Sequence, residues 1–238
     1  MIERGMRLAA CATLALAAAW IGLRLHASHA DRGSGGIAVP VGEASAPTAS
    51  DLADQPALPA PSKIPEHLPD FSLKSVDGKL TSVHSWDGQS LVINFWATWC
   101  APCRQEIPLL EGLSSEWAGR GVTFVGIAVD HPDQVKSFAQ ELKIPYALLV
   151  GEQDALDVAT RFGVETPVFP FTVFTDRRGE VVALYVGELH RAQADLILST
   201  VQDLDRDRVA LQQARRSITD GLHALAAPPN SAGKAHNS

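Results

Sequence analysis

The sequence predicts a mixed α/β domain with an extension at each end, and three observations support this fold class. Residues 122–129 form a continuous apolar run, which is typical of a strand buried on both faces of a sheet. A strand at 91–96 leads directly into a helix-forming segment that carries two cysteines three positions apart. Strands at 171–175 and 181–186 are joined by Asp176-Arg177-Arg178-Gly179, which indicates an antiparallel hairpin.

Length and composition limit the possible classes of function. A chain of 238 residues with 46% hydrophobic and 20% charged residues has room for one ordinary core plus extensions. The net charge of −7 and the lack of a basic run with interleaved aromatic residues argue against nucleic acid as a partner. Three cysteines are too few for a disulfide scaffold.

The N-terminus indicates export from the cytoplasm. Arg4 and Arg7 precede an apolar stretch at 8–23, so residues 1–30 are predicted to be a signal peptide or a membrane anchor. Positive charge before the stretch favours export of the chain that follows it. Ser28-His29-Ala30 would permit cleavage, but we favour an anchor that is retained. Residues 31–61, rich in Gly, Ala, Ser and Pro, are predicted to be a flexible linker.

The folded domain is expected to open with a β-hairpin. Residues 68–73 alternate as a short strand does, Asp77-Gly78 is a hairpin turn signal, and 79–83 form a second strand. The buried strand at 91–96 follows, and a helix over about 100–119 comes directly after it.

A helix and a strand are inserted after the strand at 122–129. His131-Pro132 opens a helix that runs to about Leu142 with its apolar residues on one face. A strand at 145–150 and a short helix at 154–162 complete this central insertion.

The last predicted helix starts near Arg191 and ends the domain, which we place at 62–204. Strand, helix and strand, followed by a helix, an antiparallel hairpin and a helix, form a thioredoxin-like α/β plan. Residues 205–238 are predicted to be a charged helical extension and a disordered tail.

The two cysteines indicate redox chemistry. Cys100 is expected at a helix N-terminus, where unpaired N–H groups and the helix dipole stabilise a thiolate. Cys103 lies one turn later on the same face and can close a disulfide. Zinc would need further ligands at matching spacing, and the only other cysteine is Cys11. A structural disulfide across so small a loop would stabilise little. We therefore expect no metal and no cofactor.

Residues 94–108, NFWATWCAPCRQEIP, resemble the active-site signature of the membrane-anchored TlpA/ResA-type thiol–disulfide oxidoreductases of the thioredoxin superfamily. Segments 69–73 and 77–79 resemble the N-terminal hairpin of that family. Residues 163–164 and 170–179 resemble its cis-proline segment and the hairpin that follows. The resemblance covers about residues 65–204. It implies a thioredoxin-like fold with an N-terminal β-hairpin and a central helix–strand insertion.

The resemblance also implies roles for single residues. Cys100 would attack a partner disulfide, Cys103 would resolve the mixed disulfide, and Glu106 would be the acidic residue near the cysteines. Trp99 would shield the site, and Pro170 would be the cis-proline beside the disulfide. A solvated carboxylate, a packed aromatic and an ordinary loop proline are the alternatives for Glu106, Trp99 and Pro170.

Two departures from the family pattern affect these roles. Asn94 occupies the strand position where thioredoxins generally have an aspartate, which shifts acid–base chemistry to the helix carboxyl. The loop at 165–169 is long and rich in proline, so Pro167 is a rival for the cis position that we assign to Pro170. Phe169 would reshape the rim that meets the partner.

The resemblance implies a reductant on the periplasmic side of the inner membrane, attached through its N-terminal segment. Its clients would be exported disulfide-containing proteins, in cytochrome c maturation or copper-site assembly, and a membrane thiol reductase would supply its electrons. The alternatives are an oxidant or isomerase in disulfide formation, a module that binds Cu(I) through the two thiols, and a peroxidase.

Overall fold

The computed structural model describes residues 64–164, 166 and 168–227. The segments predicted as anchor and linker, 1–30 and 31–61, lie outside these residues. Within the described residues, no helix has both the length and the apolar character needed to cross a membrane.

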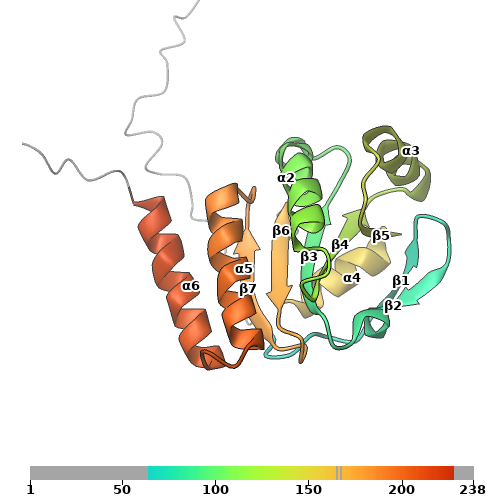
Figure 1. The fold of residues 1–238 in the computed structure, drawn as a ribbon. Helices are drawn as coiled ribbons and strands as arrows, with labels where there is room; N and C mark the ends of the chain where they lie inside the picture. Colours follow the sequence, from blue (N-terminus) through green and yellow to red (C-terminus); the bar gives the residue numbers. More distant parts are fainter. Residues whose placement is uncertain (1–63, 165, 167, 228–238) are drawn as a thin grey trace, which may run out of the picture. The chain divides into compact units, whose positions relative to one another are not determined.

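A seven-stranded mixed sheet forms the centre of the fold, in the order β2-β1-β5-β4-β3-β6-β7 (Figure 1). The central strand β3 is fully buried, and it pairs with β4 in parallel and with β6 in antiparallel orientation. This confirms the predicted thioredoxin-like α/β class. The strands are β1 (Ser72–Ser75), β2 (Leu80–Ser82), β3 (Ser90–Trp96), β4 (Val122–Val129), β5 (Ala147–Gly151), β6 (Phe171–Thr175) and β7 (Val181–Val186).

The N-terminal hairpin is present, but its first strand was predicted too early. β1 begins at Ser72 and pairs with β2 and β5, whereas Leu68 donates its N–H to the Gly179 carbonyl at 2.7 Å. The alternating segment 68–73 therefore has two sets of partners: Leu68 pairs with the β6–β7 turn, and the residues from Ser72 onward pair with β2 and β5. Gly78 has a φ of 81°, as the predicted turn requires. A short 3₁₀ helix, η1 (Val83–Trp86), follows β2.

Helices cover both faces of the sheet (Figure 1). The α2 and α5 helices share one apolar cluster with Val92, Phe124 and Phe174 of the sheet. The α4 helix packs on a second cluster that includes Phe95 and Phe171. The sheet thus lies between two apolar layers and fixes the position of the strand that precedes the cysteines. The helices are α2 (Ala101–Trp117), α3 (Pro132–Leu142), α4 (Gln153–Arg161), α5 (Arg191–Asp205) and α6 (Leu211–Ala226).

The charged segment after Leu204 forms a separate helix, α6, that packs against α5 and β7. Ala214 and Ile218 are buried in the same cluster as Leu204. Arg215 donates from Nε and Nη2 to the carbonyl of Val181 at 3.1 and 2.6 Å. The extension is therefore attached to the sheet by apolar packing and by a charged donor.

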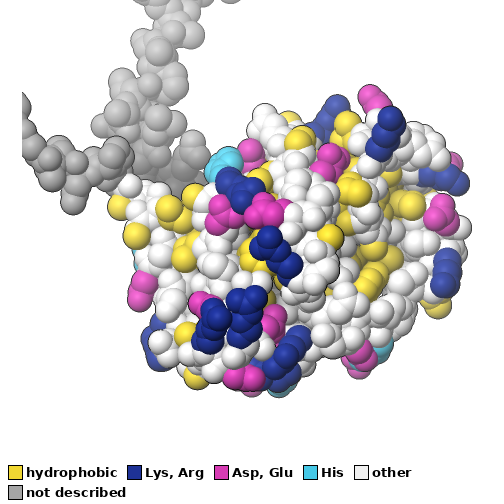
Figure 2. All heavy atoms as spheres, viewed as in Figure 1, with side chains coloured by type: hydrophobic (Ala, Val, Ile, Leu, Met, Phe, Trp, Pro, Cys, Tyr) yellow, Lys and Arg dark blue, Asp and Glu magenta, His cyan; other side chains and the backbone are white. Residues whose placement is uncertain are grey.

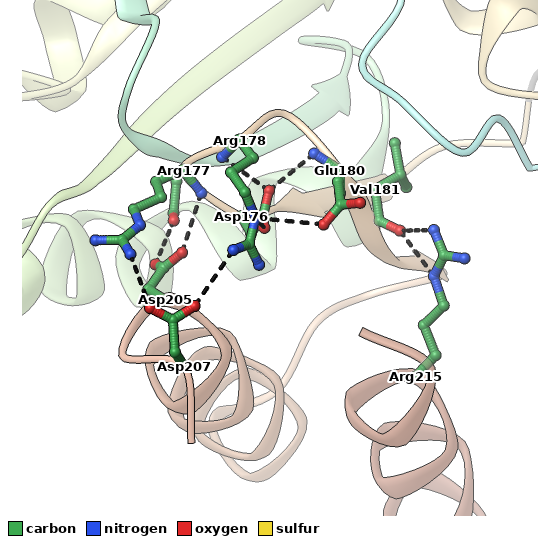
Figure 3. A network of polar contacts seen from close by, with 9 residues as sticks. Asp176, Arg177, Arg178, Glu180, Val181, Asp205, Asp207 and Arg215 are labelled. Atoms are coloured by element: carbon green, nitrogen blue, oxygen red, sulfur yellow. Dashed lines mark hydrogen bonds and ion pairs between the residues drawn. The ribbon is translucent and has the colours of Figure 1, made fainter. Parts of the chain in front are cut away.

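A polar network ties the β6–β7 hairpin to the link between α5 and α6 (Figure 3). The Asp176 side chain is fully buried and accepts from the Arg178 N–H, the Arg178 Nε and the Glu180 N–H at 2.8–2.9 Å. Asp205 accepts from the Arg177 N–H at 3.0 Å, and Asp207 pairs with both arginines. This network fixes where the α5–α6 link crosses the hairpin.

Basic and acidic side chains are mixed on the face seen in Figure 2. Oppositely charged side chains also pair within the described residues, since Arg191 lies between Glu116 and Asp195 with N···O distances of 2.9 and 2.8 Å. This face carries no uniform basic surface, in agreement with the negative net charge of the chain.

Candidate active site

Cys100 is the N-cap residue of α2, as the sequence predicted. Its Sγ accepts a hydrogen bond from the Cys103 N–H at 3.3 Å, and Pro102 occupies the first turn, where no N–H partner is needed. The two cysteines form a disulfide. Cys100 is 6% exposed and Cys103 is 0% exposed. In the reduced protein the helix N-terminus would therefore stabilise a thiolate on the more accessible sulfur.

Two aromatic residues form the surface beside this disulfide. Trp99 is 68% exposed, so the alternative of a packed core aromatic is wrong. Its ring meets the half-buried ring of Phe169 edge-to-face, with centroids 6.2 Å apart. The Phe169–Pro170 peptide bond is cis, which confirms the assigned position of the cis bond. The rival, Pro167, lies outside the described residues.

Glu106 lies one helical turn after Cys103 and is 1% exposed. The alternative of a solvated helix carboxylate is therefore wrong. Its Oε1 accepts from Asn94 Nδ2 at 2.7 Å, and its Oε2 accepts from the Leu189 N–H at 2.8 Å. Burial raises the pKa of Glu106 from its ordinary 4.5 to about 7, although these two hydrogen bonds act in the opposite direction. The carboxyl can therefore gain or lose a proton near neutral pH.

The sequence of α2 explains why this carboxyl is buried. Cys103, Glu106, Ile107 and Leu110 are all buried and follow the i, i+3, i+4, i+7 pattern of a single helix face. Glu106 thus takes a core position and faces Asn94 on β3 instead of solvent.

Asn94 joins three elements of the fold at this point. Its Nδ2 donates to Glu106 on α2 and to Thr172 Oγ1 on β6, the second at 3.1 Å. Its Oδ1 is buried and has no hydrogen-bond partner among the described residues. Rotation of the amide would let Oδ1 accept a hydrogen bond from a protonated Glu106. Asn94 can therefore serve both protonation states of the carboxyl.

Asp130 supports the loop before the cysteines, and the sequence reasoning missed it. Its Oδ2 accepts from the Thr98 N–H at 2.9 Å and from Thr98 Oγ1 at 2.5 Å. Thr98 precedes Trp99 and Cys100, so Asp130 fixes the loop that presents both. A signal was available, because Asp130 follows the apolar run of β4 and the carboxyl ends of parallel strands meet at one edge of a sheet.

The geometry offers dithiol chemistry with a neighbouring proton-exchanging carboxyl. Within residues 64–164, 166 and 168–227, no cluster of three or more His, Cys, Asp or Glu side chains could hold a metal ion. The residues chosen from the sequence lie on two segments that meet at the start of α2 and β6, namely 99–106 with Trp99, Cys100, Cys103 and Glu106, and 169–170 with Phe169 and Pro170. Their individual roles stay predictions.

Comparison with known proteins agrees with this geometry. The AhpC/TSA family profile matches residues 64–185. "Thioredoxin-like protein YneN" of Bacillus subtilis is 32% identical over 146 residues, which cover 60% of this chain and 79% of that protein. "Thiol-disulfide oxidoreductase ResA" of Bacillus thuringiensis is 28% identical over 142 residues, covering 58% and 79%.

Among solved structures, a "thiol:disulfide interchange protein, thioredoxin family protein" of Chlorobium tepidum is similar in fold and in sequence. It has a TM-score of 0.53 and 33% identity, and the match covers 59% of this chain and 99% of that one. The match therefore spans nearly all of that solved chain, while the remainder of this chain has no counterpart in it.

Proposed function

Because the chain belongs to the AhpC/TSA family and is a thioredoxin-like thiol–disulfide oxidoreductase, we propose that it reduces disulfides in exported partner proteins. The arrangement of the two sulfurs carries this proposal: Cys100 at the helix N-terminus is the more accessible one, and Cys103 is buried behind it. Such an arrangement suits attack by one sulfur and resolution by the other.

The reaction proceeds in two exchanges. The Cys100 thiolate attacks one sulfur of the client disulfide, forms a mixed disulfide and expels the other client sulfur as a thiolate, which takes up a proton. Cys103 then loses its proton and attacks the Cys100 sulfur. The Cys100–Cys103 disulfide forms, and the second client thiol is released. The client gains two electrons and two protons, which the enzyme dithiol loses.

Glu106 is placed to accept the proton of Cys103. It follows Cys103 by one turn on the buried face of α2, and a pKa of about 7 lets it take up and release a proton at neutral pH. Asn94 and the Leu189 N–H hold the carboxyl in position for this exchange.

We place the protein on the periplasmic side of the inner membrane, held by its N-terminal segment. A membrane thiol reductase would restore the dithiol with two electrons and two protons. The resemblance of residues 94–108 to the TlpA/ResA-type signature is the reason for proposing clients in cytochrome c maturation or copper-site assembly. The exposed Trp99 and the rim residue Phe169 would contact the client.

Reduction of insulin disulfides in the presence of dithiothreitol tests the activity. The wild-type chain should catalyse it, and Cys100→Ser should abolish catalysis because no attacking thiolate remains. Cys11→Ser is the matched control and should retain activity. Wild-type activity in Cys100→Ser would disprove the mechanism. Cys103→Ser should trap clients as mixed disulfides in whole cells, which identifies them.

The reduction potential decides the direction of exchange. A reduction potential of about −120 mV, measured in equilibrium with glutathione, would favour an oxidant or isomerase. A potential of about −270 mV would support a reductant. Tight Cu(I) binding against a competing chelator would favour the copper-binding alternative. Consumption of peroxide by the purified protein would favour a peroxidase.

A further inference from the structure

The turn between β7 and α5, residues 187–190, donates backbone hydrogen bonds to two active-site residues. The two donors, Gly187 and Leu189, are only two positions apart. The Gly187 N–H donates to the carbonyl of the cis-proline, Pro170, at 2.8 Å. The Leu189 N–H donates to Oε2 of Glu106, also at 2.8 Å. One short backbone segment thus connects the residue beside the client with the buried carboxyl.

We propose that this turn couples the protonation of Glu106 to the position of Pro170, so that client binding differs between the two protonation states. The proposal rests on the reductase function proposed above and adds a positioning role for residues 187–190. The Leu189 N–H makes a charge-assisted hydrogen bond with an ionised carboxylate, roughly twice as strong as one with a neutral acceptor. Ionised Glu106 therefore holds the turn, and protonation loosens it.

The structure of the turn allows a movement at Leu189 to shift Gly187. The Leu189 side chain is 1% exposed and packs in the cluster shared by α2 and α5. Gly187 has a φ of 105°, a conformation that strains residues with a Cβ. The turn is fixed at both ends, because β7 precedes it and α5 begins at Arg191. A movement at Leu189 therefore reaches Gly187 and its bond to Pro170.

Among the groups around Glu106, residues of the 187–190 turn have a direct effect on its pKa. Asn94 and Thr172 on the sheet are neutral, and the tyrosines Tyr146 and Tyr185 both have a pKa raised mainly by burial and further by nearby carboxylates. Burial is the main cause of the raised pKa of Glu106, and the negative charge of Glu188 raises it further.

Glu188 lies beside His190 within the same turn. Its Oε1 lies 3.6 Å from His190 Nδ1, and its side chain is 27% exposed. The turn thus contributes the acidic neighbour of Glu106 as well as its backbone donor.

Amide chemical shifts of the full-length, ¹⁵N-labelled oxidised protein test the coupling. The amides of Leu189 and Gly187 should follow one titration near pH 7, and both titrations should vanish in Glu106→Gln. The Gly179 amide, which bonds to the Asp176 carbonyl at 3.0 Å, is the internal control and should not follow it. Titration of Leu189 without Gly187, or of neither, would overturn the proposal.

The charge of the turn supplies a second test. Glu188→Gln should move the shared midpoint to lower pH, because it removes a negative charge near Glu106, whereas Glu152→Gln on the exposed start of α4 should not. An unchanged midpoint in Glu188→Gln would overturn the electrostatic part of the proposal.

Client binding supplies the functional test. Between pH 5.5 and 8.5, the KM of the wild type for insulin disulfides should fall by about fivefold, the effect expected if one charge-assisted hydrogen bond is lost on protonation. The KM of Glu106→Gln should stay constant over this range. A constant KM in the wild type would overturn the effect on binding. Failure of the wild type to reduce insulin would instead overturn the reductase function, while the amide titrations would still report on the coupling.

Discussion

Two carboxylates near opposite ends of β6, Glu106 and Asp176, are equally buried but differ in their neighbours. Glu106 accepts from an amide and a backbone N–H, and no Arg or Lys among the residues that the structure describes pairs with it. Asp176 accepts from two backbone N–H groups and from the Arg178 guanidinium. The cation compensates for the loss of water around Asp176, whereas neutral donors leave Glu106 ready to take up a proton.

The comparison shows that burial alone does not assign a role to a carboxylate. The hairpin carboxylate fixes the crossing of chain segments, and the active-site carboxylate can change its protonation state. The first two of the following four substitutions test this difference, and the other two test the polar contacts that hold α6 and the active-site loop. They are arranged from the largest expected effect to the smallest.

Asp176→Asn should reduce the free energy of unfolding by about 3 kcal/mol, because it weakens the charged hydrogen bonds that the buried carboxylate accepts from the half-exposed Arg178 guanidinium and from two backbone N–H groups. Urea denaturation followed by circular dichroism measures this effect. The activity of the folded fraction should match that of the wild type. A loss below about 1 kcal/mol would mean that the network contributes little to stability.

Glu106→Gln should instead increase the free energy of unfolding above neutral pH. The carboxyl ionises near pH 4.5 in the unfolded chain but near pH 7 in the folded protein, so unfolding releases a proton between these values. The wild type should therefore lose about 3 kcal/mol of stability as pH rises from 4.5 to 7. Glu106→Gln should lack this loss and should also reduce insulin more slowly.

Melting temperatures of Glu106→Gln at pH 5 and pH 8 provide the measurement, with Glu152→Gln as the control. Equal pH dependence in Glu106→Gln and the wild type would show that Glu106 is not the titrating group.

Arg215→Met should cost about 2 kcal/mol of stability, since Arg215 makes two charged hydrogen bonds to the Val181 carbonyl. The methionine keeps the apolar contact of the side chain with the sheet. Faster hydrogen exchange in α6, with unchanged exchange in α2, would show that the arginine attaches this helix locally. Arg216→Met, which substitutes an exposed neighbour, is the control and should have no effect.

Thr98→Val should cost about 1 kcal/mol, because it removes one hydrogen bond to Asp130 and keeps the shape of the side chain. The backbone bond from the Thr98 N–H remains. Thiol exchange should slow although both cysteines are intact, because the loop that presents Cys100 is less firmly held. Stopped-flow measurement of Trp99 fluorescence during reduction would detect the change.

Much of the fold follows from local patterns in the sequence. The bounds of β4, β6 and β7 agree with the prediction, because each is a run of β-branched, aromatic or other apolar residues bounded by turn or loop residues. Cys100 was expected at a helix start because a buried strand precedes it and helix-forming residues follow.

The rest depends on contacts between distant segments. The bond between the Arg177 N–H and Asp205 joins residues 28 positions apart, and no periodicity reports it. The same holds for Leu189 and Glu106, which are 83 positions apart. The sequence placed Glu106 near the cysteines, but its pKa depends on burial against the β7–α5 turn.

The pairing of Val181 has a consequence for how the protein behaves at high concentration. β7 is the last strand of the sheet, and an open edge strand can pair with another chain and start aggregation. The Val181 N–H is bound by the Glu66 carbonyl, and the Val181 carbonyl is bound by Arg215. The start of this edge therefore has no free backbone group at Val181 to offer a neighbouring molecule, so α6 contributes to protecting the edge strand from pairing with another chain.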